Sequence, residues 1–320
     1  AQVAALTSLQ AAALTSAQLG ALTTADVAAI TTADIKNLSA SALLGLNAEQ
    51  MGSLTAAQIG ALGTAQIAGL AASQVAGLST AAVVALSSTQ IGQLSAAQVA
   101  AMSNAQLAAI ETADIKSLST AALRQLSAEQ VAGMGTAQLT AFTTAQAAAL
   151  TTAQLNGLDT AHLNALGSAQ FVAFTSAQVA GLTADQVAKL ETADLAALGT
   201  AAIKGLGVDA MALLSTAQVA ALTSAQVAVL SSNQLAALST ADVAAIETAD
   251  VKALGTAALA GLSPDQMGSL TTAQILALGT AQLVALRADQ MAGLSTAAMG
   301  ALSTAQLSVL GTAQVTALGV

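Results

Sequence analysis

Large apolar residues recur at every eighth position of this chain, from Leu6 to Leu318. Of these 40 positions, 33 hold leucine, and the other seven hold isoleucine, methionine or phenylalanine. The residues between them follow one template throughout, for which Leu214–Ala221 (LSTAQVAA) is typical. A short period held over such a length is typical of a solenoid, in which each unit packs on its neighbours.

The residues after each apolar position carry the signals that begin a helix. We number the octad from the apolar residue, which is position 1. Position 2 is mostly Ser, Thr or Gly, residues that are common at a helix N-cap. Position 5 is usually Gln or Asp, whose side chain can reach back to the N–H of the cap. Positions 1 and 6, such as Leu214 and Val219, have the spacing of a hydrophobic staple, so each octad is predicted to begin its own helix.

Proline and charge placement also favour helices. Pro264, the only proline, directly follows a predicted cap, where its missing N–H costs no hydrogen bond. All 16 acidic residues lie at positions 2, 4 or 5, near the positive end of a helix dipole. Six of the seven basic residues lie near the negative end, with Arg287 as the exception. These six are Lys36, Lys116, Arg124, Lys189, Lys204 and Lys252.

One continuous helix is excluded by helix geometry. At about 100° per residue, the apolar position would rotate by roughly 80° per octad, so the leucines would not share a face. We therefore expect helices of about six residues, which are too short to persist alone in water and must be stabilised by stacking. Positions 1 and 6 are expected in a shared core, while positions 3, 4 and 7 face outward. The number of octads in one solenoid turn stays open.

The predicted fold class is an all-α solenoid of very short helices, one per eight-residue repeat. A β-solenoid is the alternative, because short repeats of Thr, Gln and Val also stack in ladders. Residues 1–320 are expected to form a single array, since no Pro/Gly linker interrupts the register. Both ends stop within the pattern, so we expect further repeats or neighbouring subunits beyond them.

A second repeat lies above the octad. Thr31–Leu38 (TTADIKNL), Glu111–Leu118 (ETADIKSL), Glu191–Leu198 (ETADLAAL) and Glu247–Leu254 (ETADVKAL) are near copies of one another. The gaps between them are 10, 10 and 7 octads, which share no factor of two or three. The octad itself is therefore interpreted as the exchangeable unit.

Composition excludes several classes of function. The chain has no cysteine, so disulfides, thiol catalysis and cysteine-ligated zinc are excluded. The net charge of −9 and the scattered basic residues argue against nucleic acid as a partner. The mean hydropathy is +0.72, yet Ser, Thr and Gln interrupt every stretch of about 18 residues, so we expect no membrane-spanning segment.

Candidate catalytic and metal-binding residues are few. His162, the only histidine, replaces the usual Gln at position 5 and is interpreted as a capping variant. Asp26 with Asp34, and Asp242 with Asp250, stand one octad apart and could meet on adjacent helices to hold calcium, although Asp in place of a capping Gln is the favoured explanation. We predict no catalytic, cofactor-binding or metal site, and no enzymatic activity.

Methionine and phenylalanine occupy core positions in this pattern. Met51, Met211, Met267, Met291 and Met299 all stand at position 6, which is typical of core filling and not of haem ligands. Phe142, Phe171 and Phe174 stand at positions 1 or 6, so the sequence predicts core packing for them and no aromatic binding surface.

The outward positions are mostly Ala, Thr, Ser and Gly, and only 7% of all residues are charged. Two interpretations stay open for the alanines. Adjacent turns of the same solenoid cover them, or they pack one solenoid against another.

The octad L-[ST]-T-A-Q-[VIL]-A-[AG] resembles the tandem LTTAQVAAL-type repeats of large secreted or surface proteins of bacteria, often labelled haem utilisation or adhesion proteins. The resemblance spans the whole chain and implies an extracellular location or one at the cell surface. It does not extend to haem, because no ligand for haem is recognisable here.

The leading functional hypothesis is a structural protein that forms a filament, stalk or surface coat by self-association. Its expected partner is the protein itself, as a homopolymer or lateral assembly, with cell-surface or matrix contact. The alternative is an adhesin-type binding module or spacer that presents an extended surface to a protein or glycan. A third hypothesis, binding to ice or mineral, would require rows of Thr at positions 2 and 3 on a flat exposed face.

Overall fold

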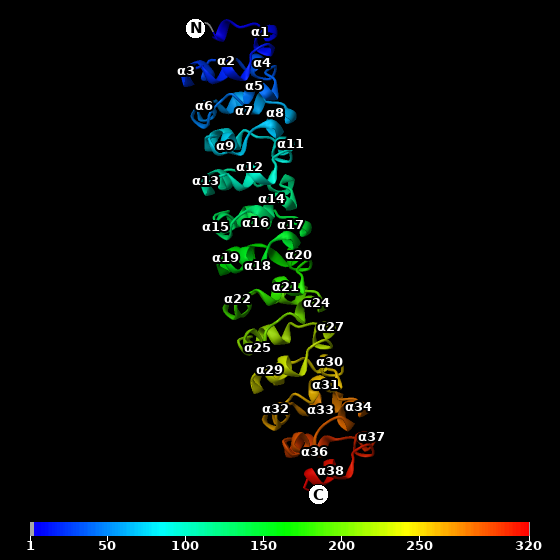
Figure 1. The fold of residues 1–320 in the computed structure, drawn as a ribbon. Coiled ribbons are helices and arrows are strands. Elements are labelled where there is room, and N and C mark those ends of the chain that lie inside the picture. Colours follow the sequence, from blue (N-terminus) through cyan, green and yellow to red (C-terminus); the bar gives the residue numbers. More distant parts are fainter. Residues whose placement is uncertain (1–2, 320) are drawn as a thin grey trace. The chain divides into compact units, whose positions relative to one another are not determined.

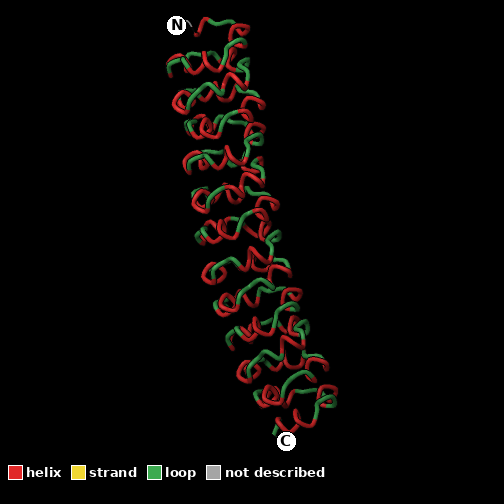
Figure 2. Tube along the Cα trace, viewed as in Figure 1, coloured by secondary structure: helices red, strands yellow, loops and turns green. Residues whose placement is uncertain are grey.

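The structure is a computed structural model that describes residues 3–319. Within them the secondary structure consists of short α-helices, with two 3₁₀ turns and no strand. Figure 2 shows helices and loops alternating along the whole trace. The predicted all-α solenoid is therefore confirmed, and the alternative of a β-solenoid is wrong.

The chain forms two compact units, which are described separately. In the first, residues 3–166, the elements are η1 (Val3–Ala5), α1 (Ser8–Ala12), α2 (Ser16–Gly20), α3 (Thr24–Ala28), α4 (Thr32–Ile35), α5 (Ala40–Leu43), α6 (Ala48–Gly52), α7 (Ala56–Ala61), α8 (Thr64–Gly69), α9 (Ala72–Ala76), α10 (Thr80–Val84), α11 (Ser88–Ile91), α12 (Ala96–Ala100), α13 (Asn104–Ala108), η2 (Ile115–Ser117), α14 (Thr120–Gln125), α15 (Ala128–Ala132), α16 (Thr136–Thr140), α17 (Thr144–Ala149), α18 (Thr152–Asn156) and α19 (Thr160–Ala165).

In the second unit, residues 167–319, the elements are α20 (Gly167–Phe171), α21 (Ser176–Ala180), α22 (Ala184–Ala188), α23 (Thr192–Ala197), α24 (Thr200–Ile203), α25 (Val208–Ala212), α26 (Thr216–Ala220), α27 (Ser224–Val227), α28 (Ser232–Ala236), α29 (Thr240–Ala245), α30 (Thr248–Val251), α31 (Thr256–Leu259), α32 (Pro264–Ser269), α33 (Thr272–Ala277), α34 (Thr280–Val284), α35 (Ala288–Ala292), α36 (Thr296–Ala301), α37 (Thr304–Leu307) and α38 (Thr312–Ala317). The single-array interpretation of residues 1–320 stays a prediction.

The α-helices begin where the octad predicts them, at position 3, except that α20 begins one residue earlier, at Gly167, and the octad of Ile110 forms only the 3₁₀ turn η2. In α26 the cap residue Ser215 has extended backbone angles, and its Oγ accepts a hydrogen bond from the backbone N of Gln218 at 3.3 Å. In return, Oε1 of Gln218 accepts one from the backbone N of Ser215 at 2.9 Å. The same reciprocal capping box recurs at most octads that have Gln at position 5, and Pro264 is the first residue of α32. The predicted caps are confirmed at most octads, whereas the cap residues Glu191 and Glu247 make no side-chain cap hydrogen bond.

The helices stack in three columns, because each helix packs against the third helix along the chain. In the second unit one column is α21, α24, α27, α30, α33 and α36, and the two other columns begin at α20 and α22. Successive members of one column, such as α21, α24 and α27, can be followed in Figure 1. In the first unit α2, α5, α8 and α11 stack in the same way. One turn of the solenoid therefore contains three octads, which answers the question that the sequence leaves open.

The core consists of positions 1 and 6, as predicted. Val219 and Leu222 are 1% and 3% exposed, and alanines that replace the larger residue at position 6, Ala11 and Ala147, are buried as well. The two positions meet because the backbone N of position 1 in one octad donates a hydrogen bond to the carbonyl of position 6 in the octad before it, as Leu222 does to Val219 at 3.2 Å. Burial of these side chains supplies the apolar contact that such short helices lack on their own.

The outward face is more exposed than it would be if adjacent turns of the same solenoid covered its alanines. Position 3 and position 4 residues, such as Thr216 and Ala217, are exposed, whereas Ala221 at position 8 is half-buried. Among the outward positions, coverage of alanines by adjacent turns is wrong for position 4, and at position 7 the alanines range from half-buried, as Ala220, to exposed, as Ala228. The alanines at position 4 remain available to another molecule.

Position 8 lies very close to the turn before it. An added Cβ at Gly261 would stand 2.4 Å from the backbone O of Ser232, which belongs to the preceding turn of the same column. Backbone cannot move away as a side-chain tip can, so this position requires glycine where the turns approach most closely.

We predict that Gly261→Ala lowers the free energy of unfolding by about 1–3 kcal/mol, because the methyl group forces two packed turns apart. Gly300→Ala is the matched control, since Gly300 lies within α36 and an added Cβ meets nothing within 4 Å. There alanine should stabilise by about 0.5–1 kcal/mol through its higher helix propensity. Denaturant unfolding of both variants measures the difference, and equal effects would contradict the close approach.

Candidate functional site

The side chain at position 5 is the most regular buried polar feature of the described residues. Gln290 is 0% exposed, and its Oε1 accepts a hydrogen bond from the backbone N of its cap residue, Arg287, at 2.9 Å. Its Nε2 donates to the carbonyls of Leu259 and Leu262, each at 2.8 Å, in the preceding turn. One amide thus completes a helix cap and joins two turns, and we call this arrangement the glutamine clamp.

The glutamine clamp recurs in both units with the same spacing. Its Nε2 reaches carbonyls 31 and 28 residues earlier, at positions 6 and 1. In the first unit this bonding is made by Gln50, Gln58, Gln66, Gln74, Gln90, Gln98, Gln106, Gln138, Gln146 and Gln154, and in the second by Gln218, Gln226, Gln234, Gln266, Gln274, Gln282, Gln290, Gln306 and Gln314. Only a Gln side chain carries one acceptor and two donors at the length needed to reach both the cap N–H and the two carbonyls of the preceding turn, which explains why Gln is common at position 5.

The aspartates that suggested calcium are engaged in other contacts. Asp26 and Asp242 accept hydrogen bonds from their cap hydroxyls, Thr23 and Ser239, at 2.7 and 2.6 Å. Asp34 accepts from the cap hydroxyl of Thr31 at 2.5 Å. Across residues 3–319 no three His, Asp or Glu side chains gather so that they could hold a metal ion. The arrangement supports the capping interpretation of these carboxylates.

Asp34 and Asp250 also contact the preceding turn through serine. Ser8 donates to Oδ1 of Asp34 at 3.3 Å, and the hydroxyl of Ser224 donates to Oδ1 of Asp250. The cap residue of α30, Glu247, makes no side-chain cap hydrogen bond, so the serine supplies a donor that the cap of this helix does not. Sequence reasoning missed this pairing.

His162 lies within the cap of α19. The cap residue is Asp159, whose Oδ1 accepts from the backbone N of His162 at 2.8 Å and lies 2.7 Å from its Nδ1. Hydrogen bonds from the backbone and ring of His162 lower the pKa of Asp159. The ring thus contacts the side chain of the cap residue, whereas Gln at this position elsewhere accepts from the backbone N of the cap residue.

Arg287, the basic residue that departs from the charge pattern, occupies the cap position of α35. Its Nε lies 3.0 Å from Oδ1 of Asp289, and this exposed contact lowers the pKa of the Asp289 carboxyl. Its guanidinium also donates to the carbonyl of Ala260 in the preceding turn. The long side chain therefore adds a contact between turns.

Asp194 is a buried carboxylate with an incomplete set of hydrogen bonds. It is 2% exposed, its Oδ1 accepts a hydrogen bond from Ser168 at 2.7 Å, and its Oδ2 has no hydrogen-bond partner. Burial raises the pKa of Asp194, and the charge of Glu191 adds to this rise, while the Ser168 hydroxyl opposes it. Ionised Asp194 therefore costs free energy in the folded state.

Methionine and phenylalanine lie largely in the core. Met51, Met211, Met267 and Met291 are fully buried, whereas Met299 is half-buried. Phe142 is buried in the first unit, and in the second the rings of Phe171 and Phe174 pack with centroids 4.7 Å apart. The prediction that the phenylalanines do not form a surface is confirmed.

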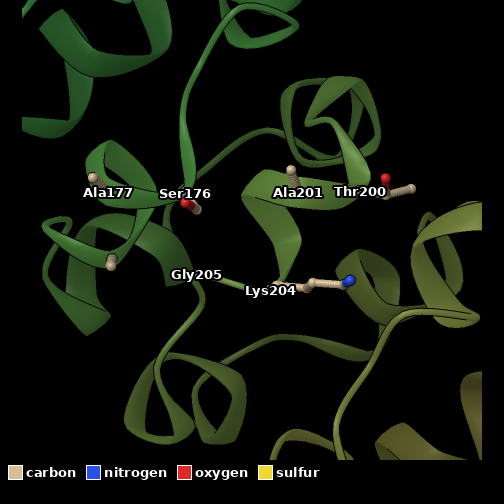
Figure 3. Close-up of a pocket in the computed structure, with 7 residues that line it drawn as sticks. Ser176, Ala177, Thr200, Ala201, Lys204 and Gly205 are labelled. Atoms are coloured by element: carbon tan, nitrogen blue, oxygen red, sulfur yellow. The ribbon is translucent and has the colours of Figure 1, made fainter.

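Shallow grooves run between stacked helices. One of about 570 Å³ lies between α21 and α24 and is lined by Ser176, Ala177, Ala180, Thr200, Ala201, Lys204 and Gly205. Figure 3 shows the Lys204 side chain extending away from Ser176 and Ala177, with short side chains along the rest of the groove. A comparable groove in the first unit contains Arg124 among alanines. These are open surfaces of small residues with a single cation each.

Together the fold and its clamps define an all-α solenoid repeat protein. The chain belongs to the ALTTAQ repeat family, whose model matches residues 27–64, 67–104, 107–144, 156–190, 187–224, 211–240, 243–280, 267–296 and 291–320. The predicted resemblance to LTTAQ-type repeats is confirmed. Comparison with curated proteins gives no match. No helix within residues 3–319 is long and apolar enough to cross a membrane.

We predict that Gln290→Glu lowers the free energy of unfolding by about 3 kcal/mol near neutral pH, because a buried carboxylate replaces the amide that donates to two carbonyls. Gln18→Glu is the control, since Gln18 is exposed and caps its own helix through Oε1 at 2.8 Å. The control should change stability by less than about 0.5 kcal/mol. Equal losses in urea unfolding would contradict a special role for the clamp.

Asp194→Asn should stabilise the protein at pH 7, because it removes a carboxylate whose pKa is raised by burial. A raised pKa in the folded state means that the penalty disappears as pH falls through that pKa toward the unfolded value of 3.8. The advantage of the Asn variant should therefore shrink from pH 7 to pH 3. Thermal unfolding at both pH values measures it, and a constant or growing advantage would contradict the assigned direction.

Proposed function

We propose that this protein is a structural, extracellular repeat protein that forms a filament, stalk or surface coat by associating with copies of itself. The observation that carries the proposal is the exposed face of small residues at positions 3 and 4, such as Thr200 and Ala201. The face recurs at every turn and bears few charges, so two copies can approach closely at low desolvation cost.

The repeated geometry favours extended association over a single contact. Because each turn presents nearly the same groups, a contact that forms at one turn is available again at the next one along the column. Many weak contacts in register can then add to a stable assembly. The glutamine clamps and the apolar core use the larger side chains for the fold, which leaves mainly Ala, Ser, Thr and Gly for this role.

The location outside the cell is supported by the resemblance to tandem repeats of secreted and surface proteins. The absence of cysteine in the sequence fits a protein whose stability depends on repetition and not on disulfides. In this proposal the partners are further copies of the chain, with contact to the cell surface or matrix.

Self-association is tested by sedimentation velocity of the purified protein over a dilution series, combined with cryo-electron microscopy. We expect the mass of the particles to rise with concentration and assemblies to show solenoids side by side or end to end. Particles of one mass at every concentration would contradict self-association and would leave a spacer or an adhesin-type binding surface.

The face itself is tested with Ala177→Glu/Ala201→Glu, which places two like charges along the groove between α21 and α24. These charges should weaken association about tenfold, equivalent to roughly 1.4 kcal/mol. Ala177→Ser/Ala201→Ser is the control and should leave association unchanged, because it keeps the residues small and neutral. Equal association of all three proteins would exclude this face as the contact.

A further inference from the structure

Four buried aspartates at position 5 contact a serine of the preceding turn. The pairs are Ser8 with Asp34, Ser88 with Asp114, Ser168 with Asp194, and Ser224 with Asp250. In each pair the serine hydroxyl donates to Oδ1, and the two residues stand 26 apart in the sequence. We call this separation the pair spacing. These aspartates belong to the four near-identical octads Thr31–Leu38, Glu111–Leu118, Glu191–Leu198 and Glu247–Leu254, which we call the ETAD octads. Each unit contains two pairs.

The two partners are coupled throughout the sequence. Serine occupies position 3 at Ser8, Ser16, Ser88, Ser168, Ser176, Ser224 and Ser232. Four of these serines stand at the pair spacing before the aspartates named above, and the other three stand at that spacing before Ala42, Ala202 and Ala258. None stands at the pair spacing before a position 5 glutamine. Serine at position 3 is thus matched to an octad in the next turn that lacks the clamp.

The glutamine clamp does not by itself determine how many octads one turn contains. Each clamp bonds to backbone carbonyls at positions 6 and 1, which every octad presents, and the leucine core is equally uniform. A turn that skipped or gained an octad would satisfy the same bonds with another octad. Uniform repeats therefore specify the stacking register weakly, as flat repetitive strands do.

The serine–aspartate pair, in contrast, forms only with a particular number of octads in one turn. An ionised aspartate only accepts hydrogen bonds, so it cannot donate to the carbonyls as glutamine does, and in the four pairs a serine of the preceding turn supplies a donor instead. Ser224 stands at the required place for Asp250 only when the turn holds three octads.

The neighbouring octad shows the alternative arrangement. Thr216 stands at the pair spacing before Asp242, but Asp242 bonds to the hydroxyl and backbone N of its own cap residue, Ser239. Asp250 instead follows the cap residue Glu247, which makes no side-chain cap hydrogen bond. Asp34 follows a hydroxyl cap residue, Thr31, as Asp242 follows Ser239, yet it accepts hydrogen bonds from both Thr31 and Ser8. The contact with the preceding turn therefore accompanies serine at the pair spacing and does not follow from aspartate alone.

We propose that the four serine–aspartate pairs are register pins that fix the solenoid at three octads per turn. The spacing of the ETAD octads agrees with this role, since the gaps of 10, 10 and 7 octads differ by three octads, which is one full turn. The octad is therefore not freely exchangeable inside a pin, which refines the interpretation made from the sequence.

The proposal is tested by deleting one octad inside or outside a pin. Deletion of Leu238–Ala245 brings Ser224 and Asp250 one octad closer in the sequence, whereas deletion of Leu214–Ala221 leaves their spacing unchanged. The inside deletion removes no glutamine clamp, because position 5 of the deleted octad is Asp242. The outside deletion removes one glutamine clamp, which is made by Gln218. We nevertheless expect the inside deletion to unfold at a midpoint at least about 3 °C lower. An equal or higher midpoint would overturn the proposal.

A rescue variant keeps the test decisive if the inside deletion does not fold. In that deletion Thr216 comes to stand at the pair spacing before Asp250, so Thr216→Ser should restore a pin and recover the lost stability. Thr256→Ser in the same deletion is the control and should change little, because Thr256 stands at the pair spacing before a glutamine, Gln282. Absence of recovery in the deletion variant would overturn the register role.

Single substitutions in the full chain give an independent measurement. Ser224→Ala should lower the unfolding midpoint, while Ser232→Ala, at the same octad position but preceding Ala258, should not. The double variant Ser224→Ala/Asp250→Gln exchanges the pin for a clamp and should recover the midpoint in the full chain. Equal effects of Ser224→Ala and Ser232→Ala would overturn the pairing.

Discussion

The fold depends on one side-chain amide that serves two helices at once. The glutamine at position 5 accepts the cap N–H of its own helix and donates to two carbonyls of the turn before it, as Gln74 does to Leu43 and Leu46 at 2.7 Å each. Helices as short as α4 and α7 would not persist alone, so their formation and their stacking must be coupled. The amide supplies that coupling, and the buried leucines around it exclude water from the bonds.

Much of this architecture could be predicted from the sequence because its causes are local. The cap and the placement of Pro264 depend on residues within one octad, and both appear in the structure as expected. The core at positions 1 and 6 follows from the same period. The number of octads per turn could not be predicted, since it depends on how the backbones of successive turns meet, as at Gly261 and Ser232.

The polar contacts between turns were missed for a related reason. A capping role explains Gln at position 5 completely, so nothing in a single octad indicates that Nε2 also reaches carbonyls of the preceding turn, as Gln290 does. The signal that could have revealed a contact between turns was the serine at a fixed spacing before each ETAD aspartate, such as Ser168 before Asp194. His162 was interpretable from sequence because its partner, Asp159, lies in the same helix cap.

The central claim, that buried glutamine amides join successive turns and leave small residues at positions 3 and 4 for contact with other copies, is tested most directly by hydrogen exchange of glutamine side chains. Protein labelled with ¹⁵N at the glutamine side chain would be transferred to D₂O and followed by NMR. The account predicts that most side-chain amide signals persist well beyond those of exposed glutamines such as Gln18, because their N–H groups are buried and bonded to carbonyls. Uniform, rapid loss of all side-chain amide signals while the backbone amides stay protected would contradict it.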